Sequence, residues 1–150
     1  FFLLYYCQME RLIKNSQFGD IKFDEDKIVE FSDGILGFED LKQFVILDIQ
    51  EFEPFQWLIS IEDPEIAFPI VSPIVVMDNY SPNLSKKEIE YFLGEFEDKD
   101  LLLYVIVTIK ENLKKVTANL KGPIIINQKS RKGIQVIVEE DYSTVHPLFG

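Results

Sequence analysis

The residues best suited to nucleophilic or metal chemistry are scarce in this sequence, which holds one histidine and one cysteine in 150 residues. A nucleophile needs a base within reach, and that base is most often a histidine. His146 lies in the stretch TVHPLFG near the C-terminus, and we interpret it as a surface or packing residue. Cys7 has no second cysteine, so neither a disulfide within the chain nor a Cys/His zinc site can form. The sequence therefore predicts no catalytic residue, metal or cofactor, and its cysteine usage fits a reducing cytoplasm.

Carboxylates are more plentiful, and Glu62 and Asp63 in the stretch EDPE are candidates for the acid–base pair of a hydrolase. Adjacent residues on a strand point to opposite faces, however, and Asp-Pro typically begins a turn. We therefore interpret this pair as structural. The acidic runs at residues 24–26 and 95–100 lack the ligand spacing of a known calcium loop, so we expect solvated turns there.

The stretch TANLKGPIIIN, residues 117–127, gathers polar residues in the manner of a small active site. Its Gly-Pro pair indicates a turn, because proline can begin a strand where its missing N–H does no harm. Asparagine side chains commonly tie such turns by hydrogen bonds to the backbone. The stretch therefore predicts a β-corner of the scaffold. The polar residues concerned are Thr117, Asn119, Lys121 and Asn127.

The elements that position these residues are mostly strands, because short apolar segments alternate with turn residues along the chain. We predict a mainly β fold, a single-domain antiparallel β-barrel or roll with one short helix. A chain of 150 residues with 47% hydrophobic content can enclose the core of one such domain. The expected strands cover residues 18–23, 27–31, 44–49, 55–61, 67–71, 73–77, 101–110, 123–127 and 133–139.

One helix is expected at residues 85–93, where SKKE fits a capping box of Ser85 and Glu88. Apolar residues then recur at helical spacing, and Gly94 ends the pattern. Pro69 cannot donate to a strand ladder, so the strand that contains it is expected to form an edge or carry a bulge.

Charge is distributed unevenly along the chain, whose formal net charge is -11. Residues 1–100 carry 22 acidic and 8 basic side chains, a net charge of -14, whereas residues 101–150 carry 4 and 7, a net charge of +3. An acidic surface repels phosphate, so it argues against direct nucleic-acid binding and suits either a basic protein partner or simple solubility.

The N-terminal stretch FFLLYYC is apolar but much shorter than the roughly 20 residues that span a bilayer. It also lacks the basic region and cleavage site of a signal peptide, so no membrane association is expected. We interpret residues 1–8 as upstream sequence outside the native domain, with Met9 as the start of a domain at residues 9–150. The alternative is a first strand or a hydrophobic tail.

Five motifs in order resemble the flagellar assembly factor FliW family: FGDIKF, FSDGILGFED, PFQWLISIEDPEIAFPIVSP, TANLKGPIIIN and YSTVHPL. They extend over residues 18–148, and GILGFE, SIEDP and TANLKGPIIIN are together specific. Two positions depart from the family pattern: Ser32 stands where many members have proline, and Pro69 interrupts a usually apolar strand.

The resemblance implies a monomeric, cytoplasmic, non-enzymatic β-barrel protein with two alternating protein partners. One partner is flagellin, bound before export. The other is the carbon storage regulator CsrA, an RNA-binding protein that represses flagellin translation. Flagellin binding would leave CsrA free to repress, and flagellin secretion would release the factor to antagonise CsrA. The resemblance assigns no contact residues.

From the residues alone, we expect the partner contact around an acidic loop beside an exposed aromatic side chain. Two further function classes stay open. A β-barrel rich in phenylalanine can hold a small apolar ligand, and a barrel can bind nucleic acid through a basic groove. Only KSRKG, residues 129–133, offers such a groove, and it is typical of a hairpin turn. The expected contact residues are Asp78, Asn79, Tyr80, Glu95, Phe96, Glu97 and Asp98.

Overall fold

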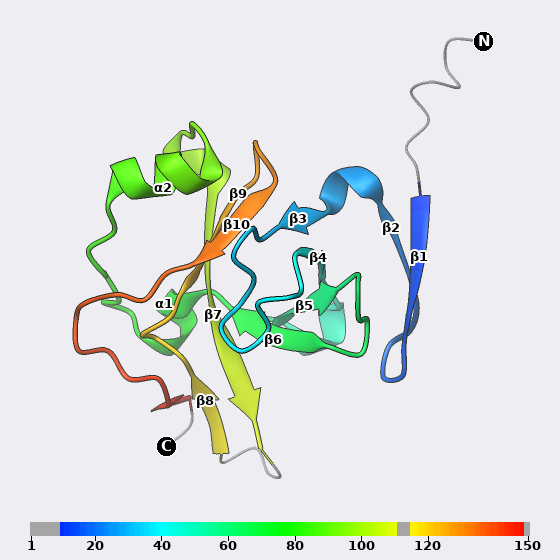
Figure 1. Ribbon diagram of the computed structural model, residues 1–150. Coiled ribbons are helices and arrows are strands. Elements are labelled where there is room, and N and C mark those ends of the chain that lie inside the picture. The colour runs from blue at the N-terminus through cyan, green and yellow to red at the C-terminus, as the bar shows by residue number, and fades with distance from the viewer. Residues whose placement is uncertain (1–9, 111–114, 149–150) are drawn as a thin grey trace.

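Seven strands close into a β-barrel in the computed structural model, which describes residues 10–110 and 115–148 (Figure 1). Neighbouring strands are antiparallel except at one seam, where a single parallel pair, Lys132 opposite Glu30, joins the last strand to the first. The predicted mainly β barrel is confirmed. In order around the barrel the strands are β3 (Val29–Glu30), β4 (Gln43–Leu47), β5 (Gln56–Ser60), β6 (Ala67–Val71), β7 (Leu101–Ile109), β9 (Ile124–Asn127) and β10 (Lys132–Gln135).

Side chains alternate between the inside and the outside of the barrel, as the period of two in a strand requires. On β4, Phe44 packs into the barrel core and Val45 into a separate cluster outside it. Apolar side chains on both faces explain why the strands appear in the sequence as nearly continuous apolar runs. The fully buried side chains of the barrel core include Val29, Phe31, Phe44, Leu58, Ile70, Ile124 and Ile126.

A hairpin of β1 (Glu10–Asn15) and β2 (Gly19–Asp24) forms a separate two-stranded sheet beside the barrel (Figure 1). The β2 strand is close to its predicted bounds, but no strand was expected at β1. The hairpin packs Ile13 and Ile21 against Trp57 and Ile59. Its turn is fixed by Asn15, whose side-chain oxygen accepts hydrogen bonds from the backbone of the next turn residues and whose amide donates to the Pro64 carbonyl at 2.7 Å.

The long strand β7 pairs with two different strands along the same edge, one after the other. Its first half pairs with β9, and its second half pairs with β8 (Val116–Ala118). The short strand β11 (His146–Pro147) pairs with β8 outside the barrel. On the other side, β7 meets β6 only at Ile70 and Val71. The strand β6 is therefore not an edge strand, which corrects the expectation from Pro69, and only its first half, residues 67–69, lacks a partner on the β7 side.

Two α-helices lie between β6 and β7, where one was expected. The helix α2 (Lys86–Leu93) confirms the prediction, with the Ser85 side chain accepting a hydrogen bond from the Glu88 backbone at 3.3 Å. The helix α1 (Pro73–Val76) is a correction, because residues 73–77 were expected to form a strand. Proline is favoured at the first position of a helix, and the β-branched residues after it misled the strand assignment. Three 3₁₀ turns complete the described elements: η2 (Glu25–Lys27), η3 (Gln50–Phe52) and η4 (Asp98–Asp100).

The predictions about residues 1–8, Cys7 and Met9 lie outside the described residues. Across the part that is described, no helix is long and apolar enough to cross a membrane.

Candidate functional site

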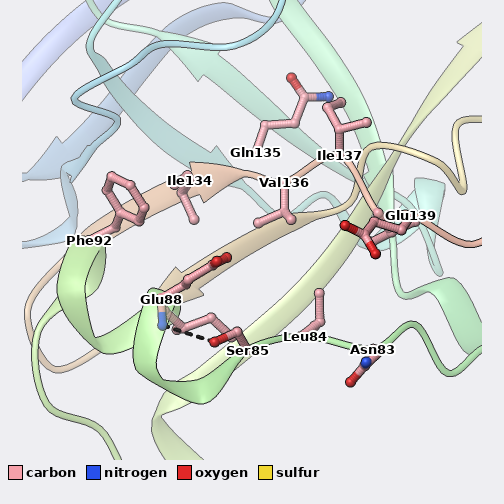
Figure 2. Close-up of a pocket in the computed structure, with 12 residues that line it drawn as sticks. Asn83, Leu84, Ser85, Glu88, Phe92, Ile134, Gln135, Val136, Ile137 and Glu139 are labelled. Atoms are coloured by element: carbon pink, nitrogen blue, oxygen red, sulfur yellow. Dashed lines mark hydrogen bonds between the residues drawn. The ribbon is translucent and has the colours of Figure 1, made fainter.

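An open groove of about 420 Å³ runs between α2 and the extended chain that leaves β10 (Figure 2). The helix contributes Ser85, Glu88, Ile89 and Phe92, which share one face because they are three, four and seven residues apart. The opposite wall is formed by residues 134–139. Two segments some fifty residues apart in sequence thus build one surface.

The wall of residues 134–139 stays extended because it continues the β10 ladder past the last residue of that strand. The backbone N–H groups of Val136 and Val138 donate to the Pro123 and Lys121 carbonyls at 2.9 and 3.0 Å. In Figure 2, Ile134 and Val136 point toward the helix, whereas Gln135 and Ile137 point away from it. The side chains that point toward the helix form the floor of the groove, and this alternation makes that floor apolar.

Apolar side chains remain accessible along this groove. Of the residues that line it, Phe92 is 48% exposed and Ile137 is 57% exposed. Large apolar side chains exposed together often indicate a binding surface. The carboxylates of Glu88 and Glu139 lie among these residues, so the groove combines an apolar floor with negative charge.

The expected contact residues Asp78, Asn79 and Tyr80 follow α1, and the structure corrects one of them. Asp78 and Asn79 are exposed, but Tyr80 is buried and is not the exposed aromatic side chain that was expected. Its hydroxyl donates to the Leu120 carbonyl at 2.7 Å, and its ring lies 4.7 Å from that of Tyr142. Burial, followed by the neighbouring Tyr142 and Glu140, raises the pKa of Tyr80 to about 12.

The second expected group, residues 95–98, follows the C-terminal end of α2. Glu95, Glu97 and Asp98 are exposed, while Phe96 is half-buried against the cluster beneath the helix. Glu97 caps η4 and forms a 3.4 Å ion pair with Lys99. Asp78–Tyr80 follow α1, and residues 95–98 follow α2, so the helix and the loop before it separate the two groups along the chain. Their role as contact residues stays a prediction.

The polar residues of TANLKGPIIIN support the backbone, which confirms the predicted β-corner. The side-chain oxygen of Asn119 accepts hydrogen bonds from the backbone N–H groups of Lys121 and Gly122 at 3.1 and 3.0 Å. Asn127 is fully buried, and its amide donates to the Leu93 carbonyl at 2.9 Å. It therefore fastens the end of α2 to the barrel.

The other candidates for chemistry also have structural contacts. One carboxylate oxygen of Glu62 accepts from the backbone N–H groups of Lys42 and Gln43 at 2.6 and 2.8 Å, so this side chain joins two turns. His146 stands in β11 opposite Ala118. The KSRKG segment forms the β9–β10 turn, as predicted, and Arg131 donates to the Lys27 carbonyl at 2.6 Å. Among the described residues, no group of three or more His, Cys, Asp or Glu side chains could hold a metal ion.

The barrel interior is occupied by side chains, which argues against a small-ligand barrel. Phe31, Phe44, Leu58 and Ile70 are each 0% exposed inside it. A ligand bound there would have to displace them, and a close-packed core resists such displacement.

The sequence reasoning missed the groove beside α2, and the only signal for it was weak. The segment GIQVIVE was predicted as a strand, but β10 ends at Gln135 and the remaining residues become a groove wall. The signal was an apolar run in the sequence that extends beyond the observed strand.

Comparison with known proteins gives a consistent result. The family model described as FliW protein matches residues 11–148. The flagellar assembly factor FliW of Caldanaerobacter subterraneus subsp. tengcongensis is 42% identical over 142 residues, which cover 93% of each chain. That of Thermotoga maritima is 38% identical over 91% of this chain and 93% of its own.

Similarity to a solved structure supports the same assignment. The crystal structure of the flagellar assembly factor FliW aligns with 93% of this chain and 98% of its own chain, at 37% identity and a TM-score of 0.84. The matched region contains the barrel, both helices and the β1–β2 hairpin, because the family model begins at residue 11 and ends at residue 148. The chain therefore belongs to the FliW family, whose members are flagellar assembly factors.

Proposed function

We propose that the protein binds flagellin in the cytoplasm and, when free of flagellin, binds the translational regulator CsrA and so relieves repression of flagellin synthesis. Membership of the FliW family supports this proposal. The protein would act as a monomer and without catalysis, with the two partners competing for it by mass action. The amount of unexported flagellin would then set the rate of its own translation.

The proposed binding of CsrA is supported by the distribution of charge along the chain. Residues 1–100 have 22 acidic and 8 basic side chains. An RNA-binding protein presents basic side chains to phosphate, so an acidic surface complements it and repels the RNA. The carboxylates of Glu95, Glu97 and Asp98 are exposed after α2, and Asp78 and Asn79 are exposed in the turn after α1.

We propose that both expected groups contribute contacts, with the groove beside α2 between them. Its apolar floor and its carboxylates Glu88 and Glu139 suit a partner segment that carries apolar and basic side chains together. Buried apolar anchors surrounded by charged residues are the usual arrangement of an interface hot spot. Tyr80 would contribute indirectly, by holding the turn before the helix through its bond to Leu120.

A calorimetric titration tests the proposal directly. The protein is titrated with CsrA, and the titration is repeated after saturation with flagellin. We expect heat of binding in the first experiment and its loss in the second, because the two partners compete. Absence of heat with both cognate partners, using folded protein, would rule the proposal out. Binding of CsrA that flagellin does not affect would rule out the partner switch alone.

A further inference from the structure

The strands β6 and β7 pair over only two residues each and then separate, which leaves a space between them. Their ladder consists of Val71 opposite Val105 and Ile70 opposite Ile106. Continuing the same register would place Pro69 opposite Val107, but no such pair forms. In Figure 1, β6 and the end of β7 run apart from this junction. We call residues 67–69 and 107–109 the β6–β7 wedge.

The direction of the backbone groups on β6 explains why the ladder stops. The Ser60 N–H donates to the Ile66 carbonyl at 3.0 Å, in register with the β5–β6 pairs. Hydrogen-bonded pairs alternate in an antiparallel ladder, so the backbone groups of Ala67 and Pro69 must face β7. Pro69 has no N–H to donate to Val107, and the hydrogen-bonded pair cannot close.

The backbone groups on β7 face the same space. The Asn119 N–H donates to the Ile106 carbonyl at 2.9 Å, in register with the β7–β8 pairs. By the same alternation, Ile106 and Thr108 direct their backbone groups toward β8, whereas Val107 and Ile109 direct theirs into the wedge. Within the described residues, no strand pairs with Val107 or Ile109 on this side. The wedge therefore has a free strand edge along β7.

The wedge opens into a hollow of about 620 Å³, whose lining differs from the acidic surface of the rest of the chain. Its described lining residues are apolar side chains, amides and hydroxyls, and none of them is charged. Leu36 at its margin is 69% exposed and Ile109 is 50% exposed. The groove beside α2 differs, since its lining includes Glu88 and Glu139.

We propose that the β6–β7 wedge receives an extended, uncharged segment of flagellin, which adds a strand to the free edge of β7. Addition of a strand to an open edge is a common mode of peptide recognition, in which main-chain hydrogen bonds supply the affinity. An uncharged lining offers no partner for a charged segment, which would lose its hydration without compensation. The choice of flagellin rests on the proposed function, because the basic RNA-binding partner suits the acidic surface instead.

Amide exchange on the intact chain tests the added strand. Exchange of individual backbone amides is measured by NMR, with and without saturating flagellin. We expect exchange of Val107 and Ile109 to slow at least about tenfold in the complex, because each N–H gains a hydrogen-bond acceptor. Formation of the complex with unchanged exchange at both amides would overturn this inference and leave the proposed function intact.

A matched pair of variants at one site gives a second test. Ile109→Pro removes the last N–H directed into the wedge, whereas Ile109→Ala removes the side chain and keeps that N–H. Ile109 is half exposed and ends β7, and its pair with Val116 is not a hydrogen-bonded one, so the ladder to β8 is retained. We expect flagellin affinity to fall roughly three- to tenfold further in Ile109→Pro than in Ile109→Ala, as loss of one hydrogen bond predicts.

The outcomes separate the two proposals. Equal flagellin affinities in the two variants would overturn the wedge inference alone. Binding of CsrA serves as the internal control, and it should be the same in both variants. Equal weakening of flagellin and CsrA by Ile109→Pro would show a general disturbance of the fold and would overturn the assignment of the wedge to flagellin. Absence of flagellin binding to the unmodified chain would overturn both proposals.

Discussion

Single buried polar residues fasten the loops of this protein to its barrel, and Asn127 is the clearest case. It is fully buried, its amide donates to the Leu93 and Glu95 carbonyls at 2.9 and 3.2 Å, and its oxygen accepts from the Lys129 N–H at 3.0 Å. Removal of the Asn127 side chain takes the donor from the Glu95 carbonyl and the acceptor from the Lys129 N–H, whereas the Leu93 carbonyl keeps the bond from the Ser130 hydroxyl at 2.6 Å. Each polar group that loses its partner in a buried place is costly.

We therefore expect Asn127→Ala to lower the free energy of unfolding by about 2–4 kcal/mol. Urea-induced unfolding followed by circular dichroism measures this change. Gln128→Ala is the matched control, because Gln128 is the exposed neighbour on the same turn, and its effect should be within about 0.5 kcal/mol. Similar losses in both variants would contradict the role given to Asn127.

Tyr80 makes the stability of the folded state depend on pH in the alkaline range. Burial raises the pKa of Tyr80 to about 12, whereas a tyrosine in an unfolded chain has a pKa of about 10. Unfolding therefore releases a proton between these values, and the stability must fall as the pH rises from about 10 toward 12. Burial also raises the pKa of Tyr104, which adds to the fall.

Tyr80→Phe should weaken this pH dependence, because the titrating hydroxyl is gone. It should also lower the free energy of unfolding at pH 8 by about 1 kcal/mol through loss of the bond to Leu120. Urea unfolding at pH 8, 10 and 11 measures both effects. An unchanged slope above pH 10 would show that Tyr80 does not remain protonated in the folded state.

At the scale of elements, α2 depends on its N-terminal cap because it has only eight residues. Ser85→Ala removes the acceptor for the Glu88 N–H and should cost about 1 kcal/mol, or about 2–4 °C in Tm for a domain of this size. Ser81→Ala, an exposed serine in the preceding loop, is the control. A calorimetric scan compares the two, and equal shifts would contradict the capping role.

Most elements of the barrel could be predicted because their strand signal is local. Alternation and β-branched residues located β2, β4, β5, β6, β7 and β9 within one or two residues. The sequence could not distinguish α1 from a strand, since PIVVM suits both, and only its place after Ser72 and its initial proline favour a helix. Pro69 suggested an edge strand, but β6 is paired on both sides and only the β7 partner of residues 67–69 is missing, which depends on the register of the two strands.

The candidate surfaces were predictable only in part, because they depend on contacts between distant segments. The exposure of Glu95, Glu97 and Asp98 followed from their charge. The burial of Tyr80 did not follow from its neighbours, since it results from packing against Tyr142 and Leu120, about forty residues or more away. The groove beside α2 was likewise invisible because its two walls come from separate parts of the chain.

At the scale of the whole molecule, the acidic surface should act on the rate of association. Neutralising the carboxylates after α2 with Glu95→Gln, Glu97→Gln and Asp98→Asn should slow association with CsrA and flatten its dependence on salt, because charge steers encounter between proteins. Stopped-flow measurements at several ionic strengths provide the comparison. The glutamine at residue 97 can still cap η4, so the fold should be retained.

A second triple variant separates local from overall charge. Asp20→Asn, Glu51→Gln and Glu53→Gln remove the same charge from exposed positions in the hairpin and the β4–β5 connection. If the carboxylates after α2 form the contact, this variant should bind CsrA almost as fast as the unmodified protein. Equal slowing by both triple variants would assign the effect to net charge and remove residues 95–98 from the interface.

The parallel seam between β3 and β10 gives the barrel an order in which it opens. It consists of one residue pair, Lys132 opposite Glu30, reinforced by the Glu30 N–H bond to the Arg131 carbonyl at 2.9 Å. On the opposite side, β5 is paired along its length with both β4 and β6. Partial unfolding begins where the fewest hydrogen bonds must break. The barrel is thus a rolled sheet with one short parallel seam, where β3 and β10 can separate while β4, β5 and β6 stay paired.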